Sequence, residues 1–198
     1  MERDKYHIIS TYTDRLKNKY YNDLSETDRW QKEVYIFAKE LAVLSGHTSV
    51  CDLGTGSAYK LLHHFSGPEF KTLGVDVPKT ISTLRDRYPD REWKDDLDPI
   101  SPGAYDLIIA SDVIEHIPDP TSFLDFIEAA KPKDIILSTP DRSLMNAKSQ
   151  SGPPSNTTHV REWSFEELES YISSRFEVVK HFISNKRQKT QVIHARLR

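Results

Sequence analysis

A glycine-rich turn between an apolar run and a helical stretch offers the most specific chemistry in the sequence. Gly54 and Gly56 follow directly after the run Val50-Cys51-Asp52-Leu53. Glycine lets a backbone approach a bound molecule without a Cβ clash, and the N-terminus of the next helix offers unpaired N–H groups to polar or anionic atoms. This pattern indicates a ligand-binding turn, although a two-glycine turn alone occurs in many α/β proteins.

An acidic residue follows at a spacing that suits a ribose. Asp76 ends the next apolar run, 20 residues beyond Gly56. A carboxylate there accepts hydrogen bonds from ribose hydroxyls, whereas a turn former ahead of Pro78 is the alternative. Turn, spacing and strand end together favour ribose binding. A dinucleotide fingerprint has a third glycine three residues after the second, where this chain has Tyr59, so NAD is the weaker cofactor alternative.

These residues meet at one edge only if a parallel sheet positions them. Four apolar runs lack in–out alternation, as is typical of parallel strands covered on both faces. They span residues 49–53, 72–76, 105–110 and 134–138, and a weaker strand covers 92–94. Helical stretches lie near 57–66, 78–88 and 121–130, the last with Thr121 and Ser122 as N-cap candidates. The alternation predicts right-handed βαβ crossovers.

The C-terminal part departs from this alternation. Ser164 opens a capping box for a helix to about Ser173, and β-like runs at 176–179 and 191–195 follow. We predict an α/β fold with a doubly wound, mostly parallel seven-stranded Rossmann-like sheet, a C-terminal antiparallel hairpin and an N-terminal helical cap. Residues 1–198 form one domain, with the cap at 1–46 and the cofactor-binding core at 47–198.

Composition limits the compartment and the partners. A chain of 198 residues can stabilise one core without disulfides, and its single cysteine, Cys51, fits a reducing compartment. No stretch reads as a leader or a membrane span. We therefore expect a cytoplasmic protein without membrane contact. A net charge of −3 argues against a nucleic-acid partner.

With these residues in hand, the chain resembles the class I S-adenosylmethionine-dependent methyltransferases, most of all the small methyltransferase-domain enzymes of glycan and secondary-metabolite pathways. The resemblance covers residues 30–198 and implies S-adenosylmethionine as cofactor. It implies that Asp52, Gly54 and Gly56 form the motif under this cofactor. Ala58 stands where many members have a third glycine, and its small side chain is compatible with binding.

Further cofactor contacts follow from the same resemblance. Asp76 would hold the ribose hydroxyls, Asp96 would face the exocyclic amine of adenine, and Leu97 would flank the ring. The segment from Ser111 to His116 would lie beside the methionine moiety and the methyl group.

The acceptor side is implied by two weaker matches. The run Thr-His-Val-Arg-Glu-Trp-Ser at 158–164 resembles a segment that precedes a late helix in these enzymes, which places His159 and Arg161 near the substrate. Trp30, Gln31 and Tyr35 resemble part of the cap over the methionine end.

Methyl transfer mainly requires alignment of the acceptor with the methyl group. A base is needed only if the acceptor must lose a proton. His159, in the long irregular stretch 139–163, and His116 are the candidates because histidine titrates near neutrality. His116 could instead orient a loop by hydrogen bonding. Glu115 is interpreted as a charge at a helix start.

No metal site is predicted. The histidines lack zinc-type spacing with cysteine, and His63 and His64, as neighbours on a helix, are expected to point in different directions. We expect methyl transfer to a hydroxyl or amine of a small molecule or glycan, since the Asn/Asp-Pro-Pro-Tyr motif of nucleic-acid amino-methyltransferases is absent after the fourth strand. The alternatives are a non-catalytic S-adenosylmethionine-binding partner subunit and an NAD-dependent oxidoreductase.

Overall fold

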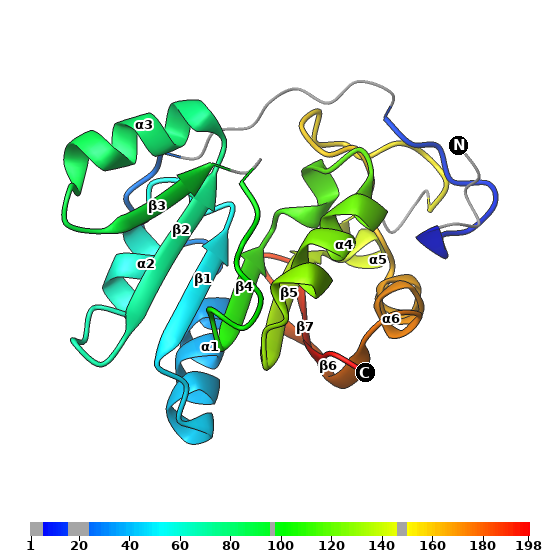
Figure 1. The fold of residues 1–198 in the computed structure, drawn as a ribbon. Helices are drawn as coiled ribbons and strands as arrows, with labels where there is room; N and C mark the ends of the chain where they lie inside the picture. Colours follow the sequence, from blue (N-terminus) through cyan, green and yellow to red (C-terminus); the bar gives the residue numbers. More distant parts are fainter. Residues whose placement is uncertain (1–5, 16–23, 96–97, 146–149) are drawn as a thin grey trace.

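The chain folds around a seven-stranded sheet, shown in Figure 1. The computed structural model describes residues 6–15, 24–95, 98–145 and 150–198. The strand order is β3-β2-β1-β4-β5-β7-β6. The first five strands pair in parallel, and β7 runs antiparallel to both β5 and β6. The strands are β1 (Ser49–Leu53), β2 (Lys71–Asp76), β3 (Glu92–Asp95), β4 (Leu107–Ser111), β5 (Asp134–Pro140), β6 (Glu177–Asn185) and β7 (Thr190–Arg196). The predicted sheet and its antiparallel C-terminal pair are confirmed.

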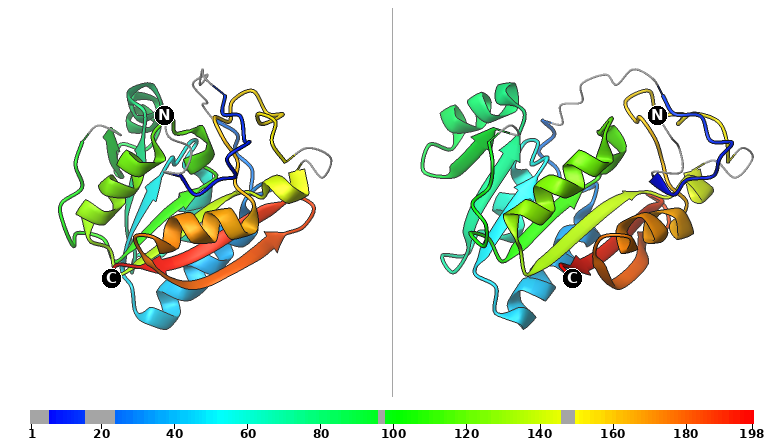
Figure 2. Two further views of the ribbon diagram at one scale, coloured as in Figure 1. Left: turned by 90° about the vertical axis from the view of Figure 1, so that its right-hand side faces the viewer. Right: turned by 45° about the vertical axis from the view of Figure 1, so that its right-hand side comes forward.

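Helices cover both faces of this sheet, as the two views of Figure 2 show. Neighbouring residues of a strand point to opposite faces, so Ile109 of β4 packs in one core and Ile108 in the other. The first core includes side chains of α1 (Lys32–Ser45), α2 (Tyr59–His64) and α3 (Pro78–Arg87), and the second includes those of α4 (Pro120–Ala130) and α6 (Phe165–Ser173). This double coverage explains why the strands read as continuous apolar runs.

The N-caps of α6 and α4 can be compared with those predicted from the sequence. Ser164 caps α6 in the predicted capping box with Glu167. The predicted N-cap of α4 is wrong, because Asp119 takes that position and its carboxylate accepts from the backbone N–H groups of Thr121 and Ser122. Pro120 occupies the first turn, where its missing N–H has no helical partner to lose.

Within the predicted N-terminal helical cap, the described α-helix is α1, and the described residues before it are not α-helical. Residues 6–15 and 24–31 form turns and irregular backbone, and α1 begins only at Lys32. Val34 and Ala38 of α1 are fully buried in the core of the sheet. Residues 6–15 instead lie beside the segment 150–163, where the Thr13 N–H donates to the Ser151 carbonyl at 2.8 Å. Among the described residues, no helix is long and apolar enough to cross a membrane.

Candidate active site

A cavity of about 1020 Å³ opens beside the carboxyl ends of β1 and β4. The strand order reverses between these two strands, which is where ligands bind in open α/β sheets. A smaller cavity of about 420 Å³ lies against β3, and none of the predicted site residues that the structure describes lines it. The larger cavity is lined by most of them, namely Gly54, Gly56, Asp76, Ser111, His116 and His159.

The turn after β1 needs its glycines. Gly54 has a φ of +75°, and a Cβ at this position would lie 2.5 Å from Cγ2 of Val113. Gly56 also has a positive φ, of 54°. Ala58, the N-cap of α2, adopts a φ of 60°, which costs a non-glycine residue about 1–2 kcal/mol. This backbone conformation accounts for the glycine that the resembling enzymes often carry there.

Asp76 lies at the end of β2 and shapes the turn as well as facing the cavity. Its Oδ2 accepts from the Gly56 N–H and its Oδ1 from the Val77 N–H, both at 2.8 Å. Charged acceptors make the stronger hydrogen bonds to backbone N–H groups. A carboxylate held in this way is fixed where a bound ribose could use its remaining lone pairs.

Asp52 plays a different part from the one expected. It is fully buried and does not line the cavity. Its carboxylate accepts from the Tyr35 hydroxyl and from Thr55 Oγ1, both at 3.0 Å, and burial raises its pKa to about 7 against these hydrogen bonds. Asp52 is therefore a positioning residue, which ties the glycine turn to α1.

The remaining cofactor residues are only partly described. Asp96 and Leu97 lie outside the described residues. Ser111 ends β4 and lines the cavity, and its Oγ lies 3.0 Å from Ser138 Oγ. The Ser138 hydroxyl donates to Asp112 Oδ1 at 2.6 Å. These contacts fix the backbone where β4 leads into the cavity wall.

The two predicted catalytic histidines meet in this cavity. His116 lies on the short 3₁₀ helix η2 (Ile114–His116), and its ring centroid is 4.9 Å from that of His159. The Nδ1–H of His116 donates to the Thr158 carbonyl at 3.0 Å. Burial lowers the pKa of His116 to about 4, so its imidazole is neutral at neutral pH.

His159 is held by two partners from its own loop. Its Nδ1 lies 2.6 Å from a Glu162 carboxylate oxygen, and its Nε2 lies 3.0 Å from Asn156 Nδ2. Because an amide nitrogen only donates and a carboxylate only accepts, Nδ1 carries the proton and Nε2 the lone pair. His159 is 6% exposed and lines the cavity.

Glu115 also lines this cavity and was missed. It is 1% exposed, and its Oε2 accepts from Thr139 Oγ1 at 3.0 Å. Burial, followed by the charge of Asp112, raises its pKa well above the usual range. The interpretation as a helix-start charge is wrong, since η2 is a single turn and the side chain points inward. Its position next to His116 was the only signal available.

All three residues that were expected in the N-terminal cap line the cavity, and Tyr35 does so from α1. Trp30 and Gln31 line the cavity from the irregular segment before α1. The Gln31 side-chain amide donates to Asp112 Oδ2 at 3.0 Å. This contact connects the start of α1 to the end of β4.

Arg161 does not line the cavity, which corrects its expected role as a substrate ligand. It is fully buried, and its guanidinium carbon lies 4.1 Å from the centroid of the Tyr6 ring. Its Nε lies 3.6 Å from an Asp14 carboxylate oxygen, and Nη2 donates to the Pro118 carbonyl at 3.0 Å. Arg161 therefore holds the N-terminal segment against the body of the protein.

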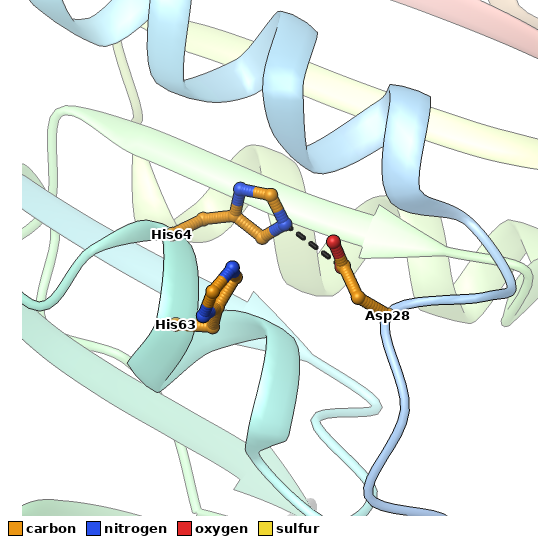
Figure 3. A group of neighbouring side chains, drawn as sticks. All are labelled: Asp28, His63 and His64. Atoms are coloured by element: carbon orange, nitrogen blue, oxygen red, sulfur yellow. Dashed lines mark hydrogen bonds and ion pairs between the residues drawn. The ribbon is translucent and has the colours of Figure 1, made fainter.

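His63 and His64 do not point apart as expected, because their ring centroids lie 5.0 Å from each other. In Figure 3 both side chains, from the end of α2, lie near Asp28. One ligand atom from each of the three residues lies within 4.8 Å of the others, as is also true of Glu115, His116 and His159. Two clusters with metal-ligand chemistry therefore exist among the described residues.

Comparison with known proteins fits this geometry. A family model described as a methyltransferase domain matches residues 17–196. The chain is similar to the methyltransferase domain of bacterial CtHen1 (22% identity, 84% of this chain and 99% of that chain, TM-score 0.62). It is also similar to a SAM-dependent methyltransferase from Aquifex aeolicus (13% identity, 88% of this chain and 97% of that chain, TM-score 0.63).

A third similar structure contains two bound small molecules. The chain is similar to this protein, the 1,6-didemethyltoxoflavin-N1-methyltransferase from Burkholderia thailandensis, which was solved with 1,6-didemethyltoxoflavin and S-adenosylhomocysteine. The identity is 18%, the match covers 86% of this chain and 81% of that chain, and the TM-score is 0.60. These likenesses show a shared fold, and no curated protein matches the chain. Because the family model spans most of its length, the chain belongs to the methyltransferase-domain family, and the expected class I S-adenosylmethionine-dependent methyltransferase is confirmed.

Proposed function

We propose that this methyltransferase transfers a methyl group to a hydroxyl or amine of a small molecule or glycan, and that it acts in the cytoplasm. The observation that carries this proposal is that His116 and His159 line the same cavity as the glycine turn. Cofactor side and acceptor side share one cavity of about 1020 Å³, which suits a donor together with a small acceptor.

The charge of the cavity supports a neutral or cationic acceptor. Lys60 is the only lysine or arginine among the described residues that line it. Asp76, Asp112, Glu115 and Asp119 supply acidic side chains. A polyanion needs several cationic contacts to bind, so the cavity disfavours a nucleic-acid acceptor. The small acceptor bound in the Burkholderia enzyme is a precedent for the class.

The residues fit the cofactor. Gly54 and Gly56 leave a cradle without Cβ atoms, and Asp76 offers a fixed carboxylate at its rim. S-adenosylmethionine, when bound, supplies a methyl group on a sulfonium. The apolar side chains of Phe123 and Phe126 line the same cavity, and exclusion of water from the reacting atoms is the role that we infer for them.

The histidine side chains that line the cavity are placed to orient the acceptor. His159 Nε2 carries a lone pair that can accept the proton of a hydroxyl, or a hydrogen bond from it. A hydroxyl must lose its proton for transfer to be completed, whereas a neutral amine need not lose it before attack. The part of the cavity lined by His116 and His159, the acceptor wall, is therefore where the choice of acceptor is made.

We expect an acceptor screen with methyl-labelled S-adenosylmethionine to give labelled product with a small hydroxyl or amine compound. Sugar nucleotides, glycans and small metabolites are compared with RNA and DNA under identical conditions. The matched control is a His159→Ala variant, which should give little product. Label transferred only to nucleic acid would refute the proposal.

Asp76→Ala is expected to weaken S-adenosylhomocysteine binding by about 10–100-fold. The variant loses charge-assisted hydrogen bonds worth roughly 1.5–3 kcal/mol, both to the ribose and to the Gly56 N–H that shapes the turn. Isothermal titration calorimetry measures the affinity, with NAD as the ligand that should not bind. The control is Asp86→Ala, which removes an exposed carboxylate from α3. Equal affinities of both variants would reduce Asp76 to a turn residue.

A further inference from the structure

Glu115, His116 and His159 form a compact group of ligating atoms on the acceptor side of the cavity. One oxygen or nitrogen from each lies within 4.8 Å of the other two. Glu115 and His159 are buried and His116 is half-buried, and all three line the cavity. The arrangement combines two imidazoles and one carboxylate around a single point, with the cavity on the open side.

Glu115 carries an atom that the fold leaves unsatisfied. Its Oε2 accepts from Thr139, but its Oε1 is buried and has no hydrogen-bond partner among the described residues. Buried carboxylate oxygens normally have a partner, because leaving one bare is costly. The negative charges of Asp112 and Glu162 act on Glu115 as well. A cation at the point shared with the imidazoles would satisfy Oε1 and offset this repulsion.

Both imidazoles are prepared as ligands. The Thr158 carbonyl accepts from Nδ1–H of His116, and the Glu162 carboxylate accepts from Nδ1–H of His159. Each contact fixes the tautomer that leaves the lone pair on Nε2. Metal-bound histidines typically donate their other ring N–H to a carboxylate or a backbone carbonyl, and these contacts orient the ligand. The Asn156 amide that now donates to His159 Nε2 would give way to the ion.

We infer that Glu115, His116 and His159 bind a divalent first-row transition-metal ion, which holds the acceptor through a hydroxyl oxygen. Imidazole with carboxylate suits Mn²⁺, Fe²⁺, Co²⁺ or Zn²⁺, whereas Ca²⁺ and Mg²⁺ prefer oxygen alone. Three protein ligands leave a coordination position open for substrate. The inference rests on the proposed function and narrows it to a hydroxyl acceptor.

The chemistry follows from the charge of the ion. Coordination lowers the pKa of a bound hydroxyl. The hydroxyl releases its proton to water, and its oxygen forms a bond to the methyl carbon as the carbon–sulfur bond of the donor breaks. The electron pair of that bond stays on sulfur, which becomes a neutral thioether. In this arrangement His116 and His159 act as ligands.

The second cluster, shown in Figure 3, is a poorer site and serves as a control. Asp28 already pairs with His64 at 2.9 Å, and the Lys32 ammonium lies 3.8 Å from its other oxygen. His63 is exposed and its ring stacks on Tyr59. A bound cation would face the lysine charge there, so we expect no specific ion at Asp28.

Mn²⁺ binding to the metal-stripped full chain tests the inference without any acceptor. We expect the electron paramagnetic resonance signal of free Mn²⁺ to fall with a stoichiometry of one ion per chain, and Mn²⁺ to raise the thermal midpoint. Glu115→Gln keeps the size of the side chain and its hydrogen bond from Thr139 but removes the anionic ligand. It should abolish binding at the Mn²⁺ concentration that saturates the wild type, while the variant stays folded. Glu162→Gln should weaken binding by about 10–100-fold.

The control variant and a second ligand make every outcome decisive. His63→Ala should bind Mn²⁺ like the wild type. Absence of Mn²⁺ binding, or loss of it in His63→Ala but not in Glu115→Gln, would overturn the inference. S-adenosylhomocysteine affinity and the acceptor screen are measured on the same preparations. If metal-free protein forms product, the metal has no role in the reaction, and the proposed function stands. If Mn²⁺ binds at Glu115 but no hydroxyl or amine compound is methylated, the metal site stands and the proposed function is contradicted.

Discussion

Replacing His159 by alanine is expected to lower turnover by about 10²–10⁴-fold, the range for loss of a group that accepts the acceptor proton. Loss of a metal ligand at the same Nε2 would lower turnover as well. The imidazole lines the acceptor wall, and Glu162 fixes its ring so that Nε2 carries the lone pair. The cofactor turn is formed by other residues. Affinity for S-adenosylhomocysteine should therefore stay within about twofold of the wild type, which corresponds to a change of less than about 0.4 kcal/mol in the binding free energy.

The matched control is His64→Ala, which removes another imidazole paired to a carboxylate but outside the cavity. Initial rates and calorimetric affinities are compared for the two variants. His64→Ala should keep near-wild-type turnover. Near-wild-type turnover of His159→Ala with the identified acceptor would show that His159 only holds its loop through Glu162 and Asn156.

The second large effect concerns stability. Arg161→Met should lower the free energy of unfolding by about 3 kcal/mol, because removing one partner of a buried ion pair leaves the other without compensation. The variant loses the pair with Asp14, the hydrogen bond to the Pro118 carbonyl and the contact with the Tyr6 ring. Methionine keeps much of the volume, so the loss reports on the charge.

Urea unfolding measures this difference. Arg175→Met is the control, since its pairs with Asp125 and Glu128 are more exposed. Exposed pairs contribute less than about 1 kcal/mol. We expect unchanged affinity of Arg161→Met for S-adenosylhomocysteine below its melting temperature. If stability were unchanged and the KM for the acceptor rose, the original assignment of Arg161 to the substrate would be restored.

The sequence predicted the sheet well because its signals are local. The predicted strand 134–138 and the observed strand β5 start at the same residue and differ only at the C-terminal end. A continuous apolar run of this kind is typical of a parallel strand that is buried on both faces. The run 176–179 underestimates β6, which continues to Asn185. Its later residues mix polar side chains with Phe182 and Ile183, and most of them are half-buried at the sheet edge, so they form no continuous apolar run.

The sequence prediction and the cavity lining agree where a residue type has one common use at one spacing, and the roles of these residues in cofactor binding stay predictions. Gly54, Gly56 and Asp76 meet this condition, and all three line the cavity. Glu115 and Arg161 were misread because charge normally predicts exposure. Burial of either residue depends on partners far along the chain, Thr139 for Glu115 and Asp14 for Arg161. No window of neighbouring residues contains that information.

The segment 156–162 gives the acceptor wall a property of its own. It supplies the Thr158 carbonyl to His116, the Glu162 carboxylate to His159, and the Val160 N–H to the backbone carbonyl of Glu115 at 2.7 Å. Opening of this one loop would therefore dismantle all three supports together. Loop order and site assembly form a single equilibrium, and whatever binds the assembled wall must shift it toward the closed state. Hydrogen exchange at the Val160 amide would then report occupancy of the acceptor wall, even for an acceptor that changes no spectrum.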